Sequence, residues 1–153
     1  MKKHLFFLLI LCAPLSAESS GEKAVKEFYA GLSMAVEMKF ADAMVSHRTA
    51  DFRGFDEFGR VRTSATDLDR FRRIFGESVS VHCRTKLVGV SGSGESLVCR
   101  VEQLWDYSKK VASDLPKLRV THEKWILEDT WQQQSGEWKL SKSVVKSRTL
   151  PRW

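Results

Sequence analysis

Hydrophobic residues follow two different periods in this chain, and the period changes near Glu77. Before Glu77 they recur every three or four residues, which is the spacing of one face of an amphipathic helix. After Glu77 they alternate with polar residues, which is typical of strands that bury one side of a sheet. Helices followed by a run of strands favour an α+β fold, with helices packed on an antiparallel sheet.

The first half carries start signals for helices. Ser19 and Glu22 have the spacing of a capping box, and one face after them is apolar, with Val25, Phe28, Tyr29, Leu32 and Val36. The pattern continues through residues 40–47, so we expect a second helix, either continuous with the first or kinked near residues 33–37. A third helix is expected to be capped by residues 64–67 and to stop at Gly76, with Leu68, Phe71 and Phe75 on one face.

The second half predicts a meander of four strands, and its closing hairpin fixes which residues face one another. Ser135-Gly136 suits a tight turn that sets Gln134 opposite Glu137. In that register Asp129 lies opposite Lys142 on a face that is otherwise apolar and aromatic. Burying two charged groups is costly unless they pair with each other. The pair is therefore either partly solvated at the open edge of the sheet or part of a ligand or catalytic site. Glu123 falls opposite Arg148, where we expect a solvent-exposed pair.

The N-terminal residues have the pattern of a targeting segment. Lys2 and Lys3 precede an apolar run over residues 5–13, and small residues then lead to Ala17. A run of about nine residues is too short to span a bilayer, which needs roughly twenty. We therefore expect a signal peptide over residues 1–17, cleaved after Ala17, a single domain over residues 18–148 and a tail over residues 149–153. The mature protein would be periplasmic or secreted, without a transmembrane segment.

Two cysteines, Cys83 and Cys99, remain after that cleavage. An oxidising compartment favours a disulfide between them. The strand register that gathers the apolar side chains on one face instead sets Cys83 opposite Gln103 and Cys99 opposite Leu87. That stagger separates the two by roughly 13 Å, whereas a bridge needs Cα atoms within about 7 Å. The disulfide Cys83–Cys99 stays open at this point.

Charge and histidine placement narrow the classes of partner. The formal net charge is +6, and the basic excess of the mature chain lies in residues 137–153, which could meet an acidic envelope partner or simply be a solvated strand face. The basic groups lack a nucleic-acid-binding pattern, so we expect no nucleic-acid partner. His82 and His122 fall on the faces opposite the apolar stripes, and no motif has metal-ligand spacing, so neither a metal site nor a cofactor is expected.

Three segments, residues 22–32, 49–56 and 129–140, together resemble the nuclear transport factor 2-like superfamily in its SnoaL-like branch. The resemblance covers nearly the whole mature chain. It implies a cone-shaped α+β fold, in which about three N-terminal helices pack on the concave face of a curved antiparallel sheet around a pocket. It also implies homodimers. Because members include isomerases, cyclases, ligand binders and assembly modules, the fold does not settle the function.

Ketosteroid isomerase is a member whose chemistry the residues can test. Its reaction needs a carboxylate base and an acid that donates a hydrogen bond to the developing enolate. The resemblance places the base near Asp56 and Glu57, and the donor of the first helix at Phe28, with Tyr29 about 100° further round the helix. Because Phe28 cannot donate, the sequence argues against steroid isomerisation.

Two function classes remain. The first is a pocket domain that binds a small apolar or aromatic molecule, or a dimerising module; the second is a cofactor-independent isomerase, cyclase or hydratase-like enzyme with a pocket carboxylate. We favour the first because no acid–base constellation is complete. The catalytic candidates are Asp56, Asp129 and His47. The expected pocket residues are Tyr29, Phe55, Phe58, Trp105, Tyr107, Trp125, Asp129, Trp131 and Lys142.

Overall fold

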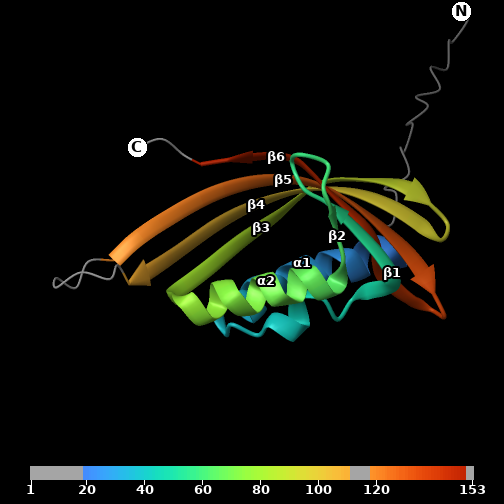
Figure 1. Cartoon of the computed structure of the whole chain (residues 1–153). Helices are drawn as coiled ribbons and strands as arrows, with labels where there is room; N and C mark the ends of the chain where they lie inside the picture. Colours follow the sequence, from blue (N-terminus) through green and yellow to red (C-terminus); the bar gives the residue numbers. More distant parts are fainter. Residues whose placement is uncertain (1–18, 111–117, 151–153) are drawn as a thin grey trace, which may run out of the picture.

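A computed structural model describes residues 19–110 and 118–150 of the chain (Figure 1). The elements in order are α1 (Ser20–Glu37), the 3-10 turn η1 (Ala41–Met44), β1 (Arg48–Phe55), β2 (Val61–Arg62), α2 (Ser64–Glu77), β3 (Ser78–Ser93), β4 (Ser96–Lys110), β5 (Leu118–Gln134) and β6 (Glu137–Thr149). The strands form one sheet in the order β2-β1-β6-β5-β4-β3. The sheet is curved, and α1 and α2 lie on its concave side (Figure 1). The expected α+β architecture is therefore confirmed.

α1 begins where the sequence predicts and ends sooner than the apolar pattern suggests. The Ser19 hydroxyl accepts a hydrogen bond from the backbone N–H of Glu22, as an N-cap should. After Glu37 the chain turns at Lys39, whose φ of 56° is incompatible with a continuing right-handed helix. The expected second helix is therefore wrong in length: it is the single turn Ala41–Met44.

Both ends of α2 differ from the predicted ones. Its N-cap is Thr63, one residue before the predicted cap, and Thr63 and Thr66 complete a capping box. The predicted stop at Gly76 is wrong, because the helix includes Gly76 and ends at Glu77. Gly76 does not have the positive φ that a glycine stop would use, and the chain passes directly into β3.

The four-strand meander forms as predicted, and β1 extends it. β1 pairs with β6 in parallel and with β2 in antiparallel orientation, so the extended piece around Phe52 belongs to the same sheet. No short-range pattern predicts this pairing, because the two strands lie far apart in sequence.

Two one-residue bulges in β6 decide which of its side chains face the helices. The hairpin begins in the predicted register, with Gln134 opposite Glu137, and Gly136 has the positive φ of 84° that its turn needs. Pairing then skips Ser141, and it skips a second residue at Lys146. Each skip reverses the alternation of inward and outward side chains. As a result Ser143 faces Asp129, and the predicted pairing of Asp129 with Lys142 is wrong.

The β3–β4 register differs from the predicted one by two residues at Cys83 and by three residues at Cys99. Cys83 lies opposite Trp105 and Cys99 opposite Val90, with an irregularity between Leu87 and Gly89. Both cysteines are buried and free. The alternative that the sequence left open, a Cys83–Cys99 bridge, does not form in this structure because neither cysteine faces the other.

The expected signal peptide lies outside the described residues, as do the last three residues of the expected tail. β6 continues to Thr149, one residue past the expected domain boundary. Among the described residues, none of the helices has the length and apolar character needed to cross a membrane.

Candidate functional site

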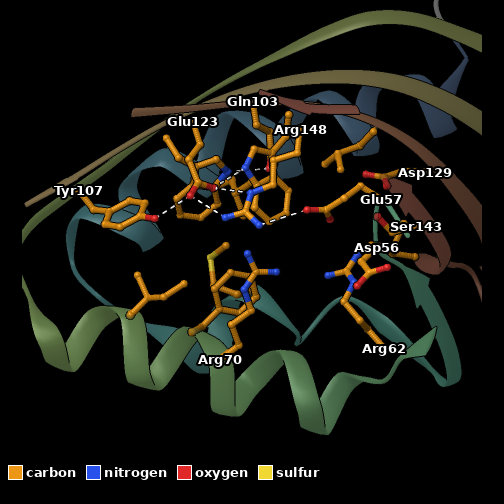
Figure 2. Close-up of a pocket in the computed structure, with 18 of the residues that line it drawn as sticks. Asp56, Glu57, Arg62, Arg70, Gln103, Tyr107, Glu123, Asp129, Ser143 and Arg148 are labelled. Carbon is orange, nitrogen blue, oxygen red and sulfur yellow. Dashed lines mark hydrogen bonds and ion pairs between the residues drawn. The ribbon is translucent and has the colours of Figure 1, made fainter. Parts of the chain in front are cut away.

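A cavity of about 720 Å³ lies between the concave face of the sheet and the two α-helices (Figure 2). Its walls mix aromatic and aliphatic side chains from α1, η1, α2 and strands β4 to β6. These apolar residues are Phe28, Leu32, Met44, Phe71, Ile74, Trp105, Trp125, Leu127 and Leu140. The Phe71 and Trp105 rings stack with their centres 6.2 Å apart, and Trp125 follows 6.4 Å further on. One side of the cavity is therefore an aromatic wall.

A buried phenol–carboxyl pair lies at one end of the cavity. The Tyr29 hydroxyl donates to Oδ2 of Asp129 across 2.5 Å, and the Trp131 indole N–H donates to the Tyr29 oxygen across 3.2 Å. The sequence resemblance placed the helix donor at Phe28. Phe28 lines the cavity, and the neighbouring Tyr29 donates to Asp129 of β5.

Asp129 is held in an environment that favours its neutral form. It is 3% exposed, and its Oδ1 atom accepts no hydrogen bond from the described residues. Burial raises the pKa of Asp129, while the hydroxyls of Ser143 and Tyr29 and the charges of Arg48 and Arg62 act in the opposite direction. Burial, together with the neighbouring Asp129, also raises the pKa of Tyr29 well above its usual range. A neutral carboxyl can donate its own proton to a ligand oxygen, while the phenol of Tyr29 already donates its proton to Oδ2 of Asp129.

Arg48 and Arg62 stand behind this pair and are fixed by Asp67 of α2. Asp67 is 1% exposed and forms ion pairs of 3.0 Å with both guanidinium groups. Burial lowers the pKa of Arg48, with Asp67 opposing that effect. This buried triad joins α2 to β1 and β2, and so it holds the helix against the open side of the sheet.

A second polar cluster, formed by Glu123, Arg148, Tyr107 and Trp125, lies on the cavity wall (Figure 2). Glu123 is 4% exposed, and both of its oxygens accept hydrogen bonds from Arg148, at 2.7 and 3.0 Å. Tyr107 and the indole of Trp125 donate to the same carboxylate. Burial would raise the pKa of Glu123, but the donors from Arg148, Tyr107 and Trp125 lower it overall. The predicted Glu123–Arg148 ion pair thus forms, although Trp125 is the residue directly opposite Arg148. The expectation of a solvent-exposed pair is wrong for Glu123, which is buried, whereas the Arg148 side chain stays 34% exposed.

The two bulges of β6 cancel at Arg148. The skip at Ser141 reverses the alternation and the skip at Lys146 restores it, so Arg148 lies on the face of Glu123, as it does in the predicted register. The third guanidinium nitrogen of Arg148 also reaches Glu57 of the β1–β2 loop, at 3.3 Å.

Asp56 and Glu57 lie at the rim of the cavity, on that loop. Partial burial acts to raise the pKa of Asp56, but hydrogen bonds from the backbone and side chain of Arg60 and from Phe58 lower it. Oδ1 of Asp56 accepts the N–H groups of Phe58 and Arg60, and Oδ2 accepts from the Arg60 side chain. Asp56 therefore stabilises its own turn, while Glu57 keeps one oxygen without a hydrogen bond from the described residues.

The structure brings some of the expected pocket residues together and separates others. Tyr29, Trp105, Tyr107, Trp125 and Asp129 line the cavity. Four expected residues lie elsewhere. Trp131 is packed in the core behind Tyr29, Phe58 is 74% exposed on its loop, and Phe55 and Lys142 contact each other, with Nζ 5.5 Å from the ring centre.

Of the catalytic candidates, Asp129 and Asp56 line the same cavity and His47 does not. His47 packs on Phe28, with ring centres 4.9 Å apart, and lines a second hollow between α1 and the β5–β6 hairpin. Among the described residues, no three His, Cys, Asp or Glu side chains converge as metal ligands would.

Sequence reasoning missed Ser143, Arg70 and Arg148 as cavity residues. Ser143 faces inward because of the bulge at Ser141, which no residue pattern in β6 predicts. The predicted register placed Arg148 opposite Glu123, but in a solvent-exposed pair outside the cavity. Arg70 occupies a polar position next to the apolar stripe of α2, where an arginine ordinarily reads as a solvent-facing residue.

No family model matches the sequence, and no curated protein matches it. Solved structures with similar folds include a conserved protein from Planctomyces limnophilus, with a TM-score of 0.69 at 11% identity over 80% of this chain and 92% of that one. A proposed dehydratase of the NTF2-like family from Streptomyces avermitilis has a TM-score of 0.65 at 13% identity, covering 82% and 95%. An NTF2-like protein of unknown function in nutrient uptake from Rhodospirillum rubrum has a TM-score of 0.59 at 17% identity, covering 79% and 95%. The chain therefore has the nuclear transport factor 2-like fold.

Proposed function

We propose that this protein binds a small, largely apolar or aromatic molecule in the cavity, with an oxygen of the ligand facing Tyr29 and Asp129. The observation that carries the proposal is Oδ1 of Asp129, which is buried and has no hydrogen-bond partner among the described residues. An unpaired buried polar atom is costly. A ligand oxygen at this point would satisfy it, because a neutral carboxyl can donate the bond.

The size and lining of the cavity support this proposal. A volume of about 720 Å³ suits a small organic ligand, since such pockets commonly hold about 300 to 1,000 Å³. The aromatic wall of Phe71, Trp105 and Trp125 offers flat apolar surface to a ring system. The polar groups are few and lie at defined places, as in pockets that orient one ligand.

Nuclear magnetic resonance with 2-naphthol as the probe tests this proposal. We expect the indole N–H signals of Trp105 and Trp125 to shift in a saturable way, because both lie in the cavity wall. The signal of Trp138 is the internal control, since Trp138 lines the second hollow. Tyr29→Phe should weaken binding by about tenfold, because it removes the hydrogen bond that holds the Asp129 carboxyl in place. Shifts at Trp138 alone would contradict the proposal.

A second candidate function is a cofactor-independent enzyme that moves a proton within such a ligand. It is favoured by Glu57, whose carboxylate shares the cavity with the acid Asp129, so that a base and an acid could act on one molecule (Figure 2). The fold neighbour described as a proposed dehydratase is consistent with this candidate.

Deuterium exchange distinguishes the enzyme from the binder. With 1-tetralone in D₂O, an enzyme would exchange the protons next to the carbonyl faster than buffer does. Glu57→Gln and Asp129→Asn should each remove that acceleration while naphthol still binds to Glu57→Gln. Exchange at the buffer rate, with binding intact, favours the non-catalytic pocket.

Export and self-association remain proposals of the same kind. We expect the mature protein to begin at residue 18 and to be found in the periplasm or outside the cell, which N-terminal sequencing of fractionated cells tests. We also expect a homodimer, which sedimentation of the mature chain tests.

An acidic partner at β6 is less favoured, because Lys139 and Lys146 form ion pairs with Glu137 and Glu128.

A further inference from the structure

Arg70 extends from the middle of α2 into the cavity (Figure 2). The side chain is half-buried, and its guanidinium carbon lies 4.6 Å from the centre of the Trp125 ring. Within residues 19–110 and 118–150, no carboxylate forms an ion pair with it and no acceptor takes a hydrogen bond from it. The guanidinium thus lies over an indole ring, while its N–H groups have no acceptor among the described residues.

The other basic groups of the cavity differ from Arg70 in this respect. Four arginines and a lysine have acidic partners: Arg48 and Arg62 with Asp67, Arg60 with Asp56, Arg148 with Glu123 and Glu57, and Lys109 with Glu77. Arg73 is exposed at the mouth. In the described part of the chain, Arg70 is therefore the half-buried cation of this cavity that lacks an acidic partner.

The electrostatic surroundings make this position unfavourable without an anion. Burial lowers the pKa of Arg70, and the positive charges of Arg62 and Arg148 act in the same direction, against the more favourable Asp67 and Glu123. An arginine nevertheless stays protonated in proteins. A charge that is partly removed from water and has no partner carries a desolvation cost, which a bound anion would offset.

We infer that the ligand of this cavity carries a carboxylate group that Arg70 binds, on an aromatic body that packs against Phe71, Trp105 and Trp125. A guanidinium presents two parallel N–H groups that match the two oxygens of a carboxylate. The contact with Trp125 holds the guanidinium of Arg70 at the cavity wall, where a ligand carboxylate can reach its N–H groups. This inference rests on the proposed pocket function, and it names the ligand class as aromatic carboxylic acids.

The test compares 2-naphthoate with 2-naphthamide, which share one ring system and differ in charge. Isothermal titration calorimetry at neutral pH measures the dissociation constant of each for the wild type, Arg70→Gln and Arg72→Gln. We expect the wild type to bind naphthoate at least tenfold more tightly than the amide, because the charged hydrogen bonds to Arg70 form only with the acid. Arg70→Gln should lose that tenfold preference and keep its affinity for the amide within about twofold. Arg72→Gln, which changes an exposed arginine of α2 outside the cavity lining, should behave as the wild type.

Each other outcome overturns a distinct part of the argument. Equal affinity for acid and amide in the wild type, unchanged in Arg70→Gln, would contradict the carboxylate and leave the apolar pocket intact. Equal losses for both probes in Arg70→Gln would show that Arg70 only supports the Trp125 wall. Failure of both probes and of 2-naphthol to bind the wild type would contradict the pocket function itself. Circular dichroism and thermal unfolding of Arg70→Gln establish that the variant is folded before binding is compared.

Discussion

Individual side chains in this cavity have properties set by what surrounds them, and Asp129 shows this most clearly. Its position in the alternation of β5 predicts that it faces inward, among Trp125, Leu127 and Trp131. Its protonation depends on groups from α1, β1 and β6 that no local pattern connects. The same contrast holds for Glu123, whose four donors come from three strands, β4, β5 and β6.

Asp129 should make the protein less stable as the pH rises. An unfolded Asp releases its proton near about pH 4. The folded protein keeps that proton to higher pH, because burial raises the pKa of Asp129. Between the two pKa values the folded state holds a proton that the unfolded state has lost, so the free energy of unfolding falls by up to about 1.4 kcal/mol per pH unit. This contribution is fully present below the unfolded pKa and is lost as the pH rises toward the folded pKa.

Urea unfolding of the wild type and Asp129→Asn from pH 4 to pH 8 measures this effect. The stability of the wild type relative to the variant should decline across that range, because Asn has no proton to lose. Asp51→Asn, at an exposed position of β1, is the matched control and should run parallel to the wild type. Parallel curves for Asp129→Asn as well would show that Asp129 titrates as an ordinary carboxyl.

Glu123→Gln should reduce the free energy of unfolding by about 2 kcal/mol, because Arg148 loses the charge that its guanidinium pairs with in a partly buried site. The amide keeps the size of the side chain, so the loss reports on charge and donors rather than on packing. Chemical denaturation measures the change. Glu137→Gln removes an exposed partner of Lys139 and should change stability by less than about 0.5 kcal/mol. Similar small losses in both variants would show that the Glu123–Arg148 ion pair does not stabilise the fold.

At the scale of elements, local sequence patterns predict where helices begin, but they do not predict the bulges of β6. Caps are local, and the sequence predicts a helix start at residues 64–67, one residue after the observed cap Thr63. Bulges are not local, because a strand of alternating residues pairs equally well with or without a skipped residue until both neighbouring strands are in place. β6 lies between β5 and β1, and its parallel register with β1 shifts as well.

Thr63→Ala should destabilise the protein by about 1 kcal/mol, since it removes the oxygen that accepts the N–H of Thr66 at the start of α2. Ser64→Ala tests the predicted cap one residue later. Because Ser64 already lies inside the helix, its replacement should change stability by less than about 0.5 kcal/mol. Thermal unfolding of both variants measures the difference. A larger loss of stability for Ser64→Ala than for Thr63→Ala would show that Ser64, and not Thr63, caps α2.

For the molecule as a whole, the helices and the curved sheet enclose the cavity and also bury both cysteines. Cys83 and Cys99 are each 2% exposed or less. Burial raises the pKa of both thiols to about 12, so few thiolates exist at neutral pH. Access to either sulfur therefore requires the opening of the core.

Alkylation of the mature chain with iodoacetamide should follow global unfolding. In the native protein we expect no labelling at pH 8 over minutes, and in urea without reductant we expect two labels, at Cys83 and Cys99. Intact-mass measurement counts them. The absence of labels in urea, with two labels after reduction, would show a disulfide and contradict the β3–β4 register. Fast labelling of the native protein would show that the core opens locally.

The sequence by itself determined the α+β class, the start of α1, the four-strand meander and the turn at Ser135-Gly136, because each depends on contacts between residues close in the chain. It also placed Asp129 and Trp125 on an inward face, since alternation within one strand is a local property. The tertiary structure alone decided that Tyr29 bonds Asp129, that Ser143 turns inward, and that Arg70 reaches into the cavity with no carboxylate partner among the described residues. Those choices arise where α1, α2 and the bulged β6 meet, and their energies depend on burial and on partners many residues away.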